Sequence, residues 1–133
     1  MTKSRREQRQ TAMIILYQIF LFKKSKNMEE IMGYINNHLK IETDFVQSLV
    51  NGVLSNYDKI INLSNKYLKE WKLERLNKVD QAILGLGVYE LLYTSTPDLV
   101  CIDEAIELSK LYSDEAVSKM INGVLDKIYH NEK

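Results

Sequence analysis

The chain has 133 residues, a formal net charge of zero, one cysteine and one proline, and 45% of its residues are hydrophobic. This composition is typical of one folded domain and excludes collagen-like, disordered and disulfide-stapled proteins. No apolar run approaches the roughly 18 residues that a membrane span needs. The lone Cys101 suits a reducing cytosol, so we expect a cytoplasmic protein.

The zero net charge hides a division of the chain. Residues 1–26 contain seven lysines and arginines but only one acid, Glu7, so they carry +6 and the remainder carries −6. A basic end suits a polyanion and an acidic remainder suits a basic partner, while a scattered solvated surface explains the same bias equally well. A signal peptide is not expected, because Lys23 follows the apolar stretch where small residues should form a cleavage site.

Helical periodicity and cap residues predict about seven helices and no strand, so the expected fold is all-α. Ser4 and Glu7 have the spacing of a capping box at the first helix. The expected helices run from Arg5 to about Phe22, Asn27 to about Leu39, Thr43 to about Ser55, Asn56 to Trp71, Asn77 to about Tyr93, about Ile102 to Tyr112, and, with Ser113 as its cap, Asp114 to about His130.

A weak internal repeat divides the single domain, residues 1–133, into two helical subdomains of about 1–72 and 73–133. Tyr17 and Tyr89 stand in similar segments 72 residues apart, and Asn51-Gly52 and Asn122-Gly123 stand in similar segments 71 apart. We expect the two halves to pack together, because neither buries much alone. Chance similarity of short segments is the alternative.

Glycines inside helical patterns need a reason, because each costs about 1 kcal/mol relative to alanine. Close approach of a neighbouring helix is the reason we favour at Gly52, Gly85, Gly87 and Gly123, over a backbone opened to a ligand.

Catalytic and metal-binding patterns are missing from the sequence. There is no phosphate-binding glycine loop and no cluster of metal ligands, since His38 and His130 are isolated. Cys101 is expected to be a small buried residue rather than a nucleophile. The carboxylates near Glu104 are interpreted as a solvated helix face. We expect no enzyme activity, no cofactor and no metal.

The first helix carries the clearest functional pattern. Arg5 and Arg6 lie in its first turn, where each opposes the helix dipole by about 0.3–1 kcal/mol. Arg9 lies one turn further, so the three guanidinium groups are expected to cluster for phosphate binding beside exposed helix N–H groups. Tyr17 lies on nearly the same face as Arg6 and offers a ring for stacking an unpaired base, although a half-buried core tyrosine is the more frequent role.

Four segments together resemble the NusB family of transcription antitermination proteins, in order and over nearly the whole chain. They are Arg5-Arg6-x-x-Arg9-x-x-Ala12-x-x-x-Leu16-Tyr17; Leu73-x-Arg75-Leu76-x-x-Val79-Asp80-x-Ala82-Ile83-Leu84 through Tyr89-Glu90-Leu91; Ile102-Asp103-Glu104-Ala105-Ile106-Glu107-Leu108-Ser109-Lys110; and Lys119-Met120-Ile121-Asn122-Gly123-Val124-Leu125-Asp126-Lys127.

The resemblance implies a non-catalytic factor that pairs with NusE, a small-subunit ribosomal protein. Together they would bind single-stranded boxA RNA of nascent ribosomal transcripts and support processive transcription within an RNA polymerase antitermination complex. Some members of the family self-associate, so a homodimer is a further implication. No membrane partner is expected.

The resemblance also assigns candidate residues. On the RNA side it places Lys3, Arg5, Arg6, Arg9, Tyr17, Lys119 and Met120. On the NusE side it places Glu74, Asp80 and Leu84, although Asp80 also stands where it would help to cap a helix behind Asn77. The family often has an aromatic residue in place of Met120, and Asp-Ser in place of Ala116-Val117. Stacking and hydrogen bonding from that side are therefore in question, although methionine still covers a base face.

Three other functions are compatible with parts of the pattern. Certain ribosomal RNA cytosine methyltransferases carry a NusB-like domain, but their catalytic part needs a glycine-rich cofactor site and a cysteine nucleophile that are not found before Lys133. A pure protein–protein adaptor would use the acidic remainder alone. DNA binding by a helix-turn-helix is disfavoured, because no helix offers a basic, polar reading face.

Overall fold

The computed structural model describes residues 3–23, 27, 29–30, 33, 43–70 and 72–133. These residues contain no strand, and they form six α-helices and one short 3-10 helix, which confirms the all-α prediction. The helices are α1 (Arg5–Phe22), α3 (Asp44–Ser55), α4 (Tyr57–Tyr67), η1 (Leu73–Arg75), α5 (Lys78–Tyr93), α6 (Asp98–Tyr112) and α7 (Glu115–Glu132). The helix expected from Asn27 to about Leu39 lies mostly outside the described residues.

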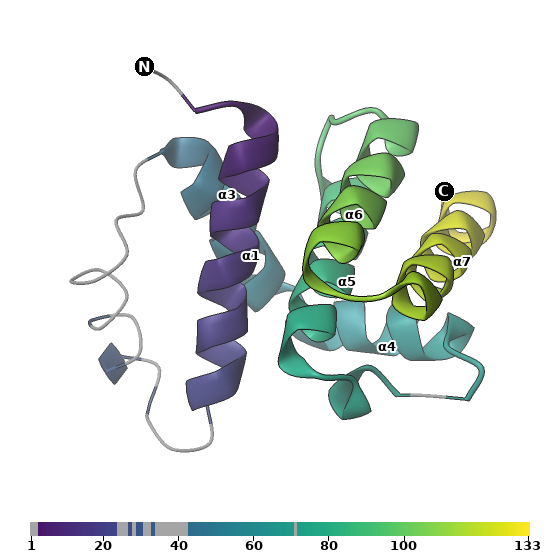
Figure 1. Cartoon of the computed structure of the whole chain (residues 1–133), viewed down its shortest axis with the longest axis horizontal. Coiled ribbons are helices and arrows are strands. Elements are labelled where there is room, and N and C mark those ends of the chain that lie inside the picture. Colours follow the sequence, from purple (N-terminus) through teal and green to yellow (C-terminus); the bar gives the residue numbers. More distant parts are fainter. Residues whose placement is uncertain (1–2, 24–26, 28, 31–32, 34–42, 71) are drawn as a thin grey trace.

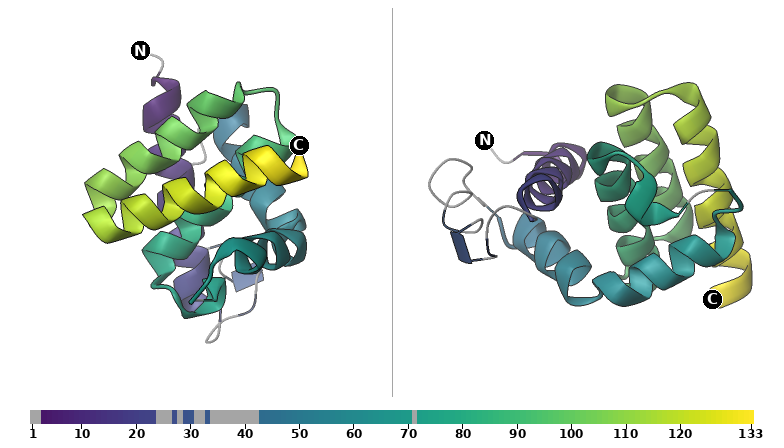
Figure 2. Two further views of the ribbon diagram at one scale, coloured as in Figure 1. Left: turned by 90° about the vertical axis from the view of Figure 1, so that its right-hand side faces the viewer. Right: turned by 90° about the horizontal axis from the view of Figure 1, so that it is seen from below.

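Helix α5 is the centre of the molecule. Its residues from Asp80 to Val88 are all buried, as expected for a helix covered on every side. Helices α1, α3, α4, α6 and α7 all pack against it. Figure 1 shows α1 and α3 on one side of the molecule and α5, α6 and α7 on the other, and the view from below in Figure 2 shows α4 running from the end of α3 along the second group to α7.

Side-chain caps fix most helix starts. Ser4 and Glu7 form the predicted capping box of α1, and the hydroxyl of Thr43 accepts a hydrogen bond from the backbone N–H of Val46 at the start of α3. The side chain of Asn77 likewise accepts from the N–H of Asp80 at the start of α5. The predicted limits of these three helices are confirmed.

Three other limits differ from the prediction. Helix α4 ends at Tyr67 rather than Trp71, because Leu68 takes an extended conformation and is buried. Helix α6 starts at Asp98, four residues early, directly after Pro97, whose fixed φ suits a helix start. Leu99 in its first turn is exposed, so the apolar periodicity that indicates a helix is interrupted there. Helix α7 is capped by Asp114 and not by Ser113.

The arrangement of helices is compatible with the predicted repeat. Helix α1 packs on α3 in the first half, and α5 packs on α7 in the second. The caps of α1 and α5, and those of α3 and α7, occupy corresponding places in the two halves. We propose on this basis that the halves at about 1–72 and 73–133 are related subdomains.

The helix glycines split into packed and unpacked positions. A Cβ on Gly52 would lie 2.0 Å from Cζ of Tyr89, and one on Gly87 would lie 3.0 Å from a methyl group of Leu125, so both are packing glycines as predicted. A Cβ on Gly85 would lie 3.7 Å from the nearest atom, which is an ordinary van der Waals distance. A Cβ on Gly123 would meet none of the described residues within 4 Å, so the packing explanation is wrong there.

Candidate nucleic-acid interface

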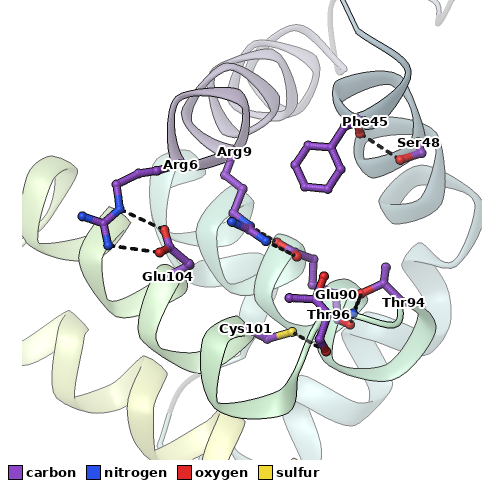
Figure 3. A network of polar contacts seen from close by, with 9 residues as sticks. All are labelled: Arg6, Arg9, Phe45, Ser48, Glu90, Thr94, Thr96, Cys101 and Glu104. Atoms are coloured by element: carbon purple, nitrogen blue, oxygen red, sulfur yellow. Dashed lines mark hydrogen bonds and ion pairs between the residues drawn. The ribbon is translucent and has the colours of Figure 1, made fainter. Parts of the chain in front are cut away.

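The capping box holds Arg5 and Arg6 in the first turn of α1, but the guanidinium of Arg6 is already paired with a carboxylate. Its Nε and Nη2 donate to the two carboxylate oxygens of Glu104 on α6, at 3.1 and 3.0 Å (Figure 3). The hydrogen bonds and charge of Glu104 raise the pKa of Arg6. The side chain of Arg6 remains 55% exposed. A phosphate therefore reaches this guanidinium only in competition with Glu104.

Arg9 is inside the protein. Its Nε and Nη2 donate to the carboxylate of Glu90 on α5 at 2.6 and 3.0 Å, and the two side chains are 7% and 4% exposed (Figure 3). Burial acts to lower the pKa of Arg9, but the hydrogen bonds and charge of Glu90 outweigh it and the pKa is raised. The expectation that Arg9 faces RNA is corrected, because its guanidinium neutralises a buried carboxylate between α1 and α5.

The remaining candidates on the first helix stay accessible to different degrees. Cζ of Arg5 lies 4.0 Å from the ring centre of Phe45 on α3, and the residue is exposed. Tyr17 is partly buried against the core, which leaves part of its ring available. Lys3 is exposed, and its backbone carbonyl accepts a hydrogen bond from the side chain of Gln8. Of the predicted cluster of three arginines, only Arg5 and Arg6 remain at the surface. A phosphate must compete with Glu104 for the guanidinium of Arg6.

The start of α7 presents the other two RNA candidates at the surface. The side chain of Lys119 is 79% exposed, and its ammonium lies 3.8 Å from the equally exposed carboxylate of Glu115. Such exposed ion pairs contribute little to the free energy of folding. Met120 is partly buried and lines two hollows of about 350 and 320 Å³ on its two sides. The smaller hollow is also lined by Arg75, Leu76, Asn77, Asp114, Ala116 and Val117.

The three partner candidates differ in accessibility. Glu74 on η1 is exposed, and a hydrogen bond from the side chain of Asn65 lowers its pKa. Asp80 is only 3% exposed, and burial raises the pKa of its carboxyl. Leu84 is completely buried. The expected direct contact of Asp80 and Leu84 with the partner is therefore corrected, because both side chains are buried in the core around α5. Of the three candidates, Glu74 alone lies on an open surface.

Catalytic features are not found in the part of the chain that the structure describes. It contains no group of three or more His, Cys, Asp or Glu side chains placed to hold a metal ion. Cys101 is buried as predicted, and burial raises the pKa of its thiol to about 11, so the thiol stays protonated. Among the described helices, none is long and apolar enough to cross a membrane.

Sequence reasoning missed the two carboxylates that receive the arginines. Glu90 carries a signal that was available, since it is the one charged residue between Ala82 and Leu92 and so sits in an otherwise apolar helix. A buried charge of this kind needs a partner. Sequence reasoning also missed Lys69 and Lys127, which come together with Lys119 around the larger hollow.

Known proteins are similar to this chain over almost all of its length. The model of the NusB family matches residues 6–130. The transcription antitermination protein NusB of Macrococcus caseolyticus is 40% identical over 129 residues, which are 97% of this chain and 98% of that protein.

Solved structures give the same result. NusB of T. maritima superposes with a TM-score of 0.82 and 34% identity, covering 98% of this chain and 94% of that one. A chain in the crystal structure of antitermination factors NusB and NusE in complex with dsRNA superposes with a TM-score of 0.77 and 27% identity, covering 98% of both. The family model, the sequence relative and the fold agree, and this chain belongs to the NusB family.

Proposed function

We propose that this chain is a non-catalytic, cytoplasmic antitermination factor that binds boxA RNA of nascent ribosomal transcripts together with NusE. It would thereby join an RNA polymerase antitermination complex and support processive transcription. The observation that carries the proposal is the likeness, over 98% of the chain, to a protein solved with NusE and dsRNA. The match to nearly the full length of an antitermination protein favours this function over that of a methyltransferase domain.

Single-stranded RNA suits the accessible residues. Met120 and Tyr17 are partly exposed and offer apolar or aromatic surface to an unpaired base. The cations proposed for the backbone are Lys3, Arg5, Arg6 and Lys119, without Arg9. Glu74 is the residue we retain for NusE. Three cations in or just before α1 and one on α7 make a small electrostatic contribution, so we expect NusE to supply part of the RNA site.

The deciding experiment is a titration of labelled boxA-like RNA with the purified chain, alone and with NusE. We expect clearly tighter binding with NusE, and a smaller salt dependence in a variant carrying Arg5→Ala and Arg6→Ala. A variant with Lys59→Ala and Lys110→Ala is the matched control, because it also removes two positive charges, from exposed residues of α4 and α6. Equal affinities with and without NusE contradict a composite site, and no binding in either case contradicts the RNA function.

A protein–protein adaptor is the second candidate. The observation in its favour is that Glu90 and Glu104 already neutralise two of the three arginines of α1. This function predicts binding of NusE with no gain in RNA affinity over NusE alone. A third titration, with NusE alone, therefore separates the two candidates. Analytical ultracentrifugation of the chain by itself tests the implied homodimer.

A further inference from the structure

The larger hollow beside Met120 contains two lysines, Lys69 and Lys127, that the proposed RNA site does not use. It lies between the end of α4 and α7 and has a volume of about 350 Å³. Its lining residues are Tyr67, Leu68, Lys69, Glu70, Lys119, Met120, Gly123, Val124 and Lys127. The charged residues of this lining are three lysines and one acid, Glu70. A hollow with this excess of positive charge suits an anion.

The lysines are open to a ligand, unlike the arginines of α1. Among the described residues, Lys69 and Lys127 have no carboxylate partner, and Lys119 has only the distant, exposed Glu115. The neighbouring cation Lys66 is taken by Glu132, at 2.8 Å. The free charge of this part of the surface is therefore concentrated on the three lysines of the hollow.

Gly123 gives an independent reason to place a ligand there. It lies in the interior of α7, where glycine is less favourable than alanine. Within the part of the chain that the structure describes, no side chain or backbone approaches it, since a Cβ would have nothing within 4 Å. The packing that accounts for Gly52 is missing at Gly123. Close approach of a ligand to bare helix backbone is the remaining use of such a glycine.

We propose that this hollow binds a backbone phosphate of single-stranded RNA, with Lys69, Lys119 and Lys127 around the anion and the bare surface of Gly123 beneath it. The inference rests on the proposed RNA function and extends it. Met120 lines both hollows, so a base lying on its side chain has its neighbouring phosphate within reach of the lysines. The strand would continue from the start of α7 toward the end of α4.

The first test removes two of the charges. A variant with Lys69→Gln and Lys127→Gln is compared with a control carrying Lys59→Gln and Lys110→Gln, which loses the same charge outside the hollow. Labelled boxA-like RNA is titrated against the complex with NusE. We expect the first variant to bind about tenfold more weakly, with a salt slope smaller by about 0.7, because the hollow holds one phosphate and each phosphate contact to a single strand contributes about 0.7. We expect the control to match the unmodified chain.

The outcomes separate this inference from the function on which it rests. If the unmodified complex binds RNA and the Lys69 and Lys127 variant binds it equally well, the inference is wrong and the RNA function stands. If that variant loses affinity for NusE while the assembled complex keeps its RNA affinity, the hollow contacts protein and the inference is again wrong. If the unmodified complex binds no RNA, both fail.

The second test uses Gly123→Ala, which adds one methyl group and removes no charge. We expect an unchanged or raised melting temperature, because alanine favours the helix and meets no atom. RNA affinity should fall at least threefold, because the added methyl group holds the phosphate away from the helix surface. Unchanged affinity in this variant contradicts the close approach to Gly123.

Discussion

Two surfaces of the molecule use the same kinds of residue in opposite ways. Where α1 and α3 meet α5, Arg9 is buried against Glu90, and the surface of Gly52 is filled by Tyr89. On α7, Lys119 is exposed, and a Cβ on Gly123 would meet no described residue within 4 Å. A cation or a helix glycine therefore does not by itself mark a binding face. What distinguishes the two surfaces is whether another helix already occupies them.

The largest effect that the comparison predicts is on folding, at Arg9. Arg9→Ala leaves the carboxylate of Glu90 buried without a partner, and such a loss costs about 3–5 kcal/mol. Urea unfolding followed by circular dichroism measures it. Replacing both partners, with Arg9→Met and Glu90→Leu, should restore most of the stability. If Arg9→Ala leaves the free energy of unfolding unchanged, this result contradicts the assignment of Arg9 to the interior.

The next effect contrasts the two glycines. Gly52→Ala forces the ring of Tyr89 from its place beside α3 and disturbs its stacking on Tyr93, at an expected cost of about 1–3 kcal/mol. Gly123→Ala should instead raise the unfolding free energy by up to about 1 kcal/mol. Thermal and urea unfolding of the two variants side by side measure the difference. Destabilisation by both, to the same extent, would show that the surface at Gly123 is filled after all.

The smallest effect concerns Asp80, at the other end of α5 from Glu90. Burial raises the pKa of Asp80, and one carboxylate oxygen has no hydrogen-bond partner in the structure. A carboxyl whose pKa is higher in the folded state loses relative stability as the pH rises above its unfolded pKa of about 4. Asp80→Asn should therefore gain stability over the unmodified chain between about pH 4 and neutral pH, and little below pH 3. A stability difference that does not change with pH contradicts this account.

The sequence determined the helices better than it determined the site. Caps at Ser4, Thr43 and Asn77 are local, so the starts of α1, α3 and α5 were predictable from neighbouring residues. The partner of Arg9 stands 81 residues away, and no local pattern reports it. The same holds for the hollow at α7, because Lys69 reaches it from the end of α4. Residues that share a pattern in one helix can thus separate into interior and surface roles through contacts that only the fold provides.

The division between structural and RNA-facing cations is tested most directly by the salt dependence of RNA binding in the variant with Arg9→Met and Glu90→Leu. With NusE present and the helix content unchanged, we predict the same slope of log affinity against log salt as in the unmodified chain, because Arg9 touches no phosphate. A slope smaller by about 0.7, the contribution of one phosphate contact to a single strand, would show that Arg9 binds RNA and would contradict the account.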